Sequence, residues 1–214
     1  MKKVWDYISA FFSSVSWQKF NALFDSRGVY YNLTKEDLDK IEDIIIRYGP
    51  LICLSRRKTH LTTYLISFIS TFWVFLKTGK WQSTYWTHAF IAEDTDTFVE
   101  AVWPAVKEST KMEVLDVDAI CLLVPDIAGW AIVGPKFVSE AKRIIGTPYD
   151  NYFDHTDASK ISCIEVVRIA LVRSIVNYYE LFYETEKILT ARGRLTPDIP
   201  YDSPDFIKLL EIRR

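Results

Sequence analysis

The chain has 214 residues, 49% of them apolar and 25% charged, a composition typical of a globular protein that can bury a core. Its net charge of −2 argues against nucleic acid as a partner, because binding to a phosphate backbone needs an excess of Lys and Arg. Three widely spaced cysteines make neither a disulfide framework nor a Cys-x-x-Cys metal site, and the odd number leaves at least one thiol unpaired.

The first 25 residues predict an amphipathic helix. Apolar side chains recur at helical spacing, at Trp5, Ile8, Phe12 and Val15. Asp6 and several serines interrupt the apolar run that a signal peptide requires, so we expect a cytoplasmic protein, with a virion-associated one as the alternative. The polar face is not Lys-rich, which favours docking onto the core or a protein partner over a membrane surface. We therefore place an N-terminal helical extension at residues 1–43.

Two more helices and a short strand are predicted next. Thr34 is placed to cap a helix with Asp37 as the third residue of a capping box, and the Gly-Pro pair at 49–50 ends that helix. The apolar run 51–54 predicts a buried strand. Residues 60–77 predict a buried helix, because their apolar stretch is shorter than the roughly 20 residues that a membrane span needs.

The middle of the chain predicts antiparallel strands, and the last third predicts helices. Two β-prone runs, 86–92 and 97–103, flank an acidic turn and indicate a hairpin. Further strands are predicted at 114–115 and 119–124, helices at 137–145 and from 163 to about 189, a polar loop at 147–160, and an extended tail from 192. Together these elements predict an α+β fold, in which a small antiparallel sheet packs against helices.

Cys163 is the cysteine best placed for chemistry. Ser162 and Glu165 form a capping box, so Cys163 occupies the first position of a helix, where the helix dipole and free backbone N–H groups favour a thiolate. The same N–H groups can stabilise an oxyanion. Cys53 and Cys121 each lie inside an apolar run and fit the commoner role of buried structural cysteines.

A cysteine nucleophile needs a base, and the chain has three histidines. His60 precedes the apolar helix and fits a surface or capping role. His155 lies in the polar loop, close to Cys163 in sequence, and stays open as a base. His88 lies within a predicted strand, which holds a side chain rigidly, and from its pattern alone a core histidine and a catalytic base are equally consistent.

Glu100 is a lone acid in an apolar strand, where burial is costly unless the charge is paired. If the hairpin turn centres on Thr95, Glu100 lies opposite Phe90, and His88 and Glu100 share one face of the sheet, diagonally placed. A shift of one residue would put them on opposite faces. On this register, Glu100 is the candidate to orient the His88 ring.

These residues resemble those of a known family. A strand with His88 and a strand with Glu100 are followed by Gly146-x-Pro148-Tyr149-Asp150-x-x-Phe153 and then by Cys163-x-Glu165-x-Val167. This order is similar to the circularly permuted branch of the NlpC-type papain-like superfamily, the YiiX/YebB-like proteins. The resemblance covers roughly residues 44–212, so we place a permuted papain-like catalytic domain at 44–214.

The resemblance implies a Cys163–His88–Glu100 triad, with Tyr149 and Asp150 as the pair beside the site that contacts substrate. It implies a cysteine hydrolase or acyltransferase acting on an amide or ester, with cell-wall peptides or lipid-like acyl groups as substrates. No metal or organic cofactor is implied. The alternative is a non-catalytic structural or binding protein that keeps the fold and docks in a larger assembly, such as a virion or an envelope complex.

Overall fold

The fold is built on one antiparallel sheet. The computed structural model describes residues 33–57, 68, 71–72, 85–150, 157, 159–175 and 196–214. Within them, six strands pair in the order β4-β3-β2-β1-β5-β6, and every pairing is antiparallel. The strands are β1 Leu51–Arg56, β2 His88–Ala92, β3 Thr97–Val102, β4 Ala105–Thr110, β5 Ala119–Pro125 and β6 Phe206–Arg213.

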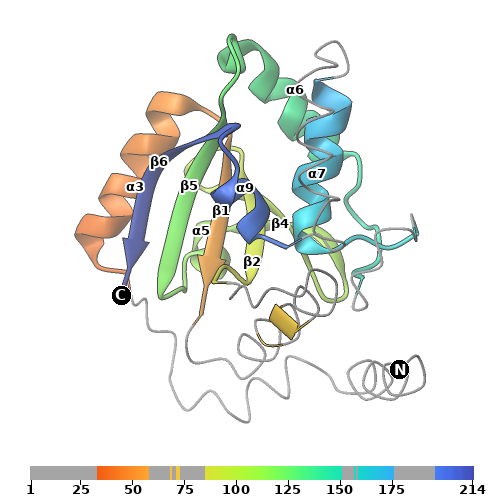
Figure 1. The fold of residues 1–214 in the computed structure, drawn as a ribbon, viewed down its shortest axis with the longest axis horizontal. Coiled ribbons are helices and arrows are strands. Elements are labelled where there is room, and N and C mark those ends of the chain that lie inside the picture. Colours follow the sequence, from red (N-terminus) through yellow and green to blue (C-terminus); the bar gives the residue numbers. More distant parts are fainter. Residues whose placement is uncertain are drawn as a thin grey trace.

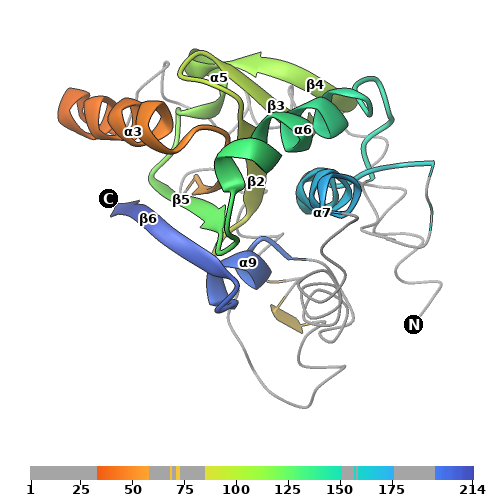
Figure 2. The same ribbon diagram turned by 90° about the horizontal axis from the view of Figure 1, so that it is seen from above.

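Helices lie on both sides of this sheet. The described helices are α3 Lys35–Tyr48, α5 Lys111–Val114, α6 Trp130–Lys142, α7 Cys163–Ser174 and α9 Asp198–Asp202. Helices α6 and α7 pack together, and α7 packs against β2 and β3, whereas α3 contacts β6 on the other side of the molecule (Figures 1 and 2). No helix in the described part of the chain is long and apolar enough to span a bilayer.

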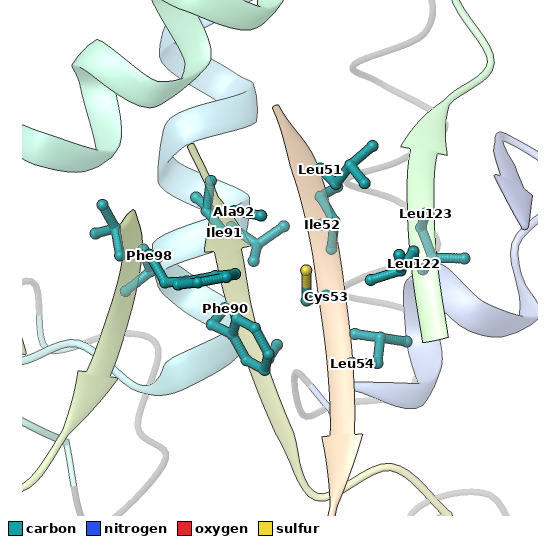
Figure 3. Packing of buried hydrophobic residues seen from close by; sticks show 14 of the residues in the cluster. Leu51, Ile52, Cys53, Leu54, Phe90, Ile91, Ala92, Phe98, Leu122 and Leu123 are labelled. Carbon is teal, nitrogen blue, oxygen red and sulfur yellow. The ribbon is translucent and has the colours of Figure 1, made fainter. Parts of the chain in front are cut away.

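The hydrophobic core lies along the central strands. Every residue of β5 is buried, and so are all but the last of β1 and all but the first of β2, because both faces of the sheet are covered there. Figure 3 shows the labelled apolar side chains of β1, β2, β3 and β5 packed side by side, with the Phe90 and Phe98 rings 5.8 Å apart. This packing fixes the strands that carry the candidate site.

Several predicted elements are confirmed. Thr34 caps α3, and its hydroxyl accepts from the Asp37 N–H while the Asp37 carboxylate accepts from the Thr34 N–H. The predicted hairpin forms as β2 and β3, with Phe90 opposite Glu100 as expected. The strand predicted at 119–124 forms as β5, and the one predicted at 51–54 forms as β1.

Three predictions about elements are wrong in part. Val114 and Leu115 end the short helix α5 rather than forming a strand, because Thr110 and Glu113 make a capping box there. Helix α6 begins at Trp130, seven residues before the predicted start, and runs through Pro135. The C-terminal tail contains α9 before its extended strand β6, and the sheet also includes β4, which was not predicted.

Other predictions lie outside the described residues. These are the helix at 1–25, most of the helix at 60–77, and the continuation of the Cys163 helix beyond 175. Phe68, Thr71 and Phe72 are helical, in agreement with the second of these. The predicted division between residues 43 and 44 falls inside α3, and the division itself stays a prediction.

Candidate active site

Cys163 is the first residue of α7. Ser162 has extended backbone angles and forms a capping box with Glu165, whose carboxylate accepts from the Ser162 N–H at 2.8 Å. The box fixes where the helix starts and therefore where the Cys163 side chain sits. Since the first N–H groups of a helix have no partner within it, Cys163 lies at a helix end able to bind negative charge.

His88 and Glu100 come from neighbouring strands under α7. Directly opposed residues of antiparallel strands share a face, so the Phe90–Glu100 pair puts His88 and Glu100 on the same face. His88 Nε2 lies 2.7 Å from Glu100 Oε2. An ionised carboxylate can only accept, so Nε2 carries the hydrogen of this bond. The expected contact between these two side chains is thus present.

The Cys163 thiol lies near the His88 ring and affects its pKa. Burial lowers the pKa of His88, but the neighbouring Cys163 and Glu100 side chains outweigh it and raise the pKa above the ordinary value. Because Nε2 is engaged by Glu100, Nδ1 is the ring nitrogen left for another partner. The Cys163, His88 and Glu100 side chains thus form one group, in which the imidazole and the carboxylate are hydrogen-bonded.

Ser109 on β4 extends this group and was not identified from the sequence. Its hydroxyl donates to Glu100 Oε1 at 2.6 Å, and the side chain is buried. Lys107 lies directly opposite Glu100 in the strand pairing, but its Nζ is 4.0 Å from the same oxygen and is bonded to Glu113 instead. Burial raises the pKa of Glu100, yet the bonds from His88 and Ser109 outweigh it and hold that pKa below its usual value.

Tyr149 and Asp150 lie beside the start of α7. Tyr149 forms a parallel bridge with Ile161, and Asp150 N–H donates to the Ile161 carbonyl at 3.1 Å, two residues before Cys163. Burial raises the pKa of Tyr149 well above its ordinary value, and the nearby ionisable groups of Cys163 and Asp150 raise it further. The Tyr149 phenol therefore stays protonated at neutral pH and keeps its hydrogen-bond donor.

The strand that carries His88 is anchored by the C-terminal part of the chain. Asp198 Oδ1 accepts from the backbone N–H groups of Tyr85 and Trp86, at 2.8 and 3.0 Å, just before β2 begins. Arg56 Nη1 donates to the Tyr85 carbonyl at 2.8 Å. These bonds fix the entry of the chain into β2, and with it the backbone at His88.

The other two cysteines do not join this group. Cys53 and Cys121 are fully buried in β1 and β5, where burial raises the pKa of both thiols, that of Cys121 to about 12. They match the structural role expected of them. His60 and His155 lie outside the described residues, so the structure does not place the second candidate base.

Comparison with known proteins shows that this chain shares its fold with a solved structure. No protein-family model and no curated protein matches the chain. Among solved structures, the crystal structure of metalloprotein yiiX from Escherichia coli O157:H7 matches with a TM-score of 0.52 at 15% sequence identity, over 78% of this chain and 98% of that one. This chain has a yiiX-like fold. At such low identity, the likeness extends to the fold and not to activity.

The yiiX protein is a metalloprotein, so we asked whether the residues of this chain fit a metal ion. Among the described residues, no three or more His, Cys, Asp or Glu side chains gather in a way that could hold one. At the candidate site, His88 Nε2 and both Glu100 oxygens are taken up by hydrogen bonds. The described donor set does not fit a metal ion.

Proposed function

We propose that this chain is a papain-like cysteine hydrolase or acyltransferase, acting on an amide or ester through Cys163, His88 and Glu100. The observation that carries the proposal is the 2.7 Å contact between His88 and Glu100, made by a ring whose pKa is raised by a thiol at a helix start. A charged histidine–carboxylate pair whose carboxylate is buried gives no advantage to packing alone, since burying charge is costly. It is the arrangement that activates a cysteine nucleophile.

The geometry supports the following reaction. Nδ1 of His88 takes the thiol proton, and the Cys163 sulfur attacks the substrate carbonyl to form a tetrahedral intermediate. Backbone N–H groups at the start of α7 stabilise the oxyanion, and the Tyr149 phenol offers a further donor. His88 returns the proton to the leaving amine or alcohol as the C–N or C–O bond breaks. Water, or an acceptor with a free hydroxyl or amine, then releases the acyl group from the sulfur.

Glu100 has two roles in this proposal. Its hydrogen bond to Nε2 fixes the ring orientation, and its negative charge stabilises the imidazolium formed during attack. Because the Glu100 pKa is held below its usual value, the carboxylate is charged throughout the neutral range. Asp150 is buried next to Tyr149, and we assign both residues to the side of the site that contacts substrate. Cell-wall peptides and lipid-like acyl groups remain the substrate classes that we propose.

The test is turnover by the purified chain of p-nitrophenyl acetate, p-nitrophenyl laurate and a dipeptide p-nitroanilide. Cys163→Ala should abolish turnover, and His88→Ala should lower it by roughly 10²–10⁴-fold, as expected for loss of a general base. The matched control is Cys121→Ala, which removes a buried thiol away from the site and should change turnover by less than about twofold. Turnover that survives Cys163→Ala would contradict Cys163 as the nucleophile. No turnover of any of the three substrates by the unmodified chain would favour the non-catalytic alternative, a binding protein that keeps the fold.

A further inference from the structure

We infer that Ser109 is a positioning residue of the proposed site, and that its hydroxyl holds the Glu100 carboxylate in the orientation from which it bonds His88. The inference rests on the proposed function and concerns how that site is built. It adds a fourth residue to the group, so that each of β2, β3 and β4 supplies one side chain: His88, Glu100 and Ser109.

The strand pairing places Ser109 where it can act on Glu100. Ser109 is opposite Phe98, and Phe98 and Glu100 lie two residues apart on β3, so Ser109 and Glu100 share a face and are diagonal neighbours. At 2.6 Å, the Ser109 hydroxyl makes a short, charge-assisted bond to Oε1, while His88 occupies Oε2. With one oxygen held by each neighbour, the carboxylate cannot rotate about its last bond without breaking a buried hydrogen bond.

Lys107 provides an internal comparison on the same strand. It approaches the same oxygen, Oε1, but at 4.0 Å, with 41% of its side chain exposed and its Nζ bonded to Glu113 at 2.8 Å. A screened charge at that distance changes the potential at Glu100 only slightly and does not fix its orientation. If the Ser109 bond matters because it orients Glu100, then loss of the hydroxyl and loss of the lysine charge should have different effects.

The experiment measures two properties of the folded protein that need no substrate. The first is the rate of Cys163 alkylation by iodoacetamide at pH 7. The second is the proton resonance of the His88 Nε2–H group in ¹⁵N-labelled protein, which a strong bond to a carboxylate shifts downfield and protects from exchange.

The variants are Ser109→Ala, the isosteric pair Ser109→Thr and Ser109→Val, and Lys107→Met. Thr and Val differ only in the hydroxyl, and both suit a strand, so this pair separates loss of the bond from loss of the fold.

We expect Ser109→Ala and Ser109→Val to slow alkylation roughly tenfold, which is about 1.4 kcal/mol, and to broaden or shift the Nε2–H resonance. Ser109→Thr and Lys107→Met should stay within twofold of the unmodified chain and keep the resonance. Equal behaviour of Ser109→Thr and Ser109→Val, or a larger effect from Lys107→Met, would overturn the inference.

Two further variants separate this inference from the proposed function. Glu100→Gln and His88→Ala should each slow alkylation more than Ser109→Ala does. If neither of them changes the rate, the proposed triad is wrong, and the inference about Ser109 is wrong with it. If both act while Ser109→Ala and Ser109→Val match the unmodified chain, the triad stands and Ser109 has no positioning role.

Discussion

At the scale of single residues, the three cysteines differ in their surroundings and not in their burial. All three are buried, and Cys163 is only 2% exposed. Cys53 and Cys121 lie within strands, where burial raises the thiol pKa, whereas Cys163 lies at a helix start against the His88 ring. Cys163 should therefore be the reactive thiol of the three, because it lies at a helix start and near the imidazole.

This difference predicts selective labelling. Iodoacetamide at pH 7 should modify Cys163 in the folded chain and leave Cys53 and Cys121 unmodified, because only a thiolate reacts at a useful rate. Peptide mapping by mass spectrometry measures each site, and the same reaction in denaturant should label all three. Equal labelling of the three cysteines without denaturant would contradict the assignment of the nucleophile.

The sequence could predict part of this site for a physical reason. A hairpin with a short turn has few registers, and period-two alternation then places His88 and Glu100 on one face. Ser109 could not be found in this way, because β4 is a strand of mixed polar residues following Pro104, without the apolar alternation that marks a buried strand. Nothing in the run AVKEST distinguishes Ser109 from its polar neighbours, and its burial is visible only in the structure.

At the scale of elements, α6 and α7 show how local rules and tertiary packing compete. Glycine and proline both disfavour a helix interior, yet α6 runs through Gly134 and Pro135. A Cβ on residue 134 would lie 3.1 Å from Pro50 Cδ, so the glycine permits close packing of the helix on the turn before β1. Trp130 Nε1 donates to the Pro50 carbonyl at 2.9 Å and holds the same contact. Such a contact between distant segments cannot be read from local sequence.

Helix α7, in contrast, starts where its capping box predicted. Ser162→Ala should lower the free energy of unfolding by roughly 0.5–2 kcal/mol, the usual cost of losing a helix cap, and should also slow Cys163 alkylation several-fold. Thr34→Ala is the matched control, since it breaks the equivalent box of α3. Urea unfolding measures the first effect in both variants. An equal loss of alkylation rate in both would mean that the effect comes from general destabilisation.

At the scale of the whole molecule, the C-terminal residues join the two sides of the fold. Strand β6 pairs with β5 at one end of the sheet, and Arg214 N–H donates to the Asp118 carbonyl at 2.9 Å. The Arg214 side chain bonds the buried Asp37 carboxylate at the start of α3, at 2.5 and 3.1 Å. Burial raises the pKa of Asp37, but the bonds from Arg214 and Thr34 outweigh it and hold that pKa below its usual value.

A pH dependence of stability follows from Asp37. A depressed pKa stabilises the fold above the unfolded-state value of about 3.9, and this contribution is lost as the pH falls through the folded-state value. Asp37→Asn should therefore cost roughly 1–3 kcal/mol at pH 7 and progressively less below about pH 4. Asp43→Asn, which breaks an exposed pair with Arg47, should cost little at any pH. Urea unfolding across this range measures both, and a pH-independent cost of Asp37→Asn would contradict the assignment.

The bond between Asp198 and the start of β2 spans 112 residues of sequence, and this has a consequence for the order of synthesis. A ribosome makes His88, Glu100 and Cys163 before it makes Asp198, so the nascent chain holds all the reactive groups while the strand entry beside His88 is still unanchored. On the proposed function, the thiol would gain its full reactivity only when the last part of the chain has emerged and folded back. A chain truncated before Asp198 would lack this anchor, and its Cys163 thiol would then stay unreactive.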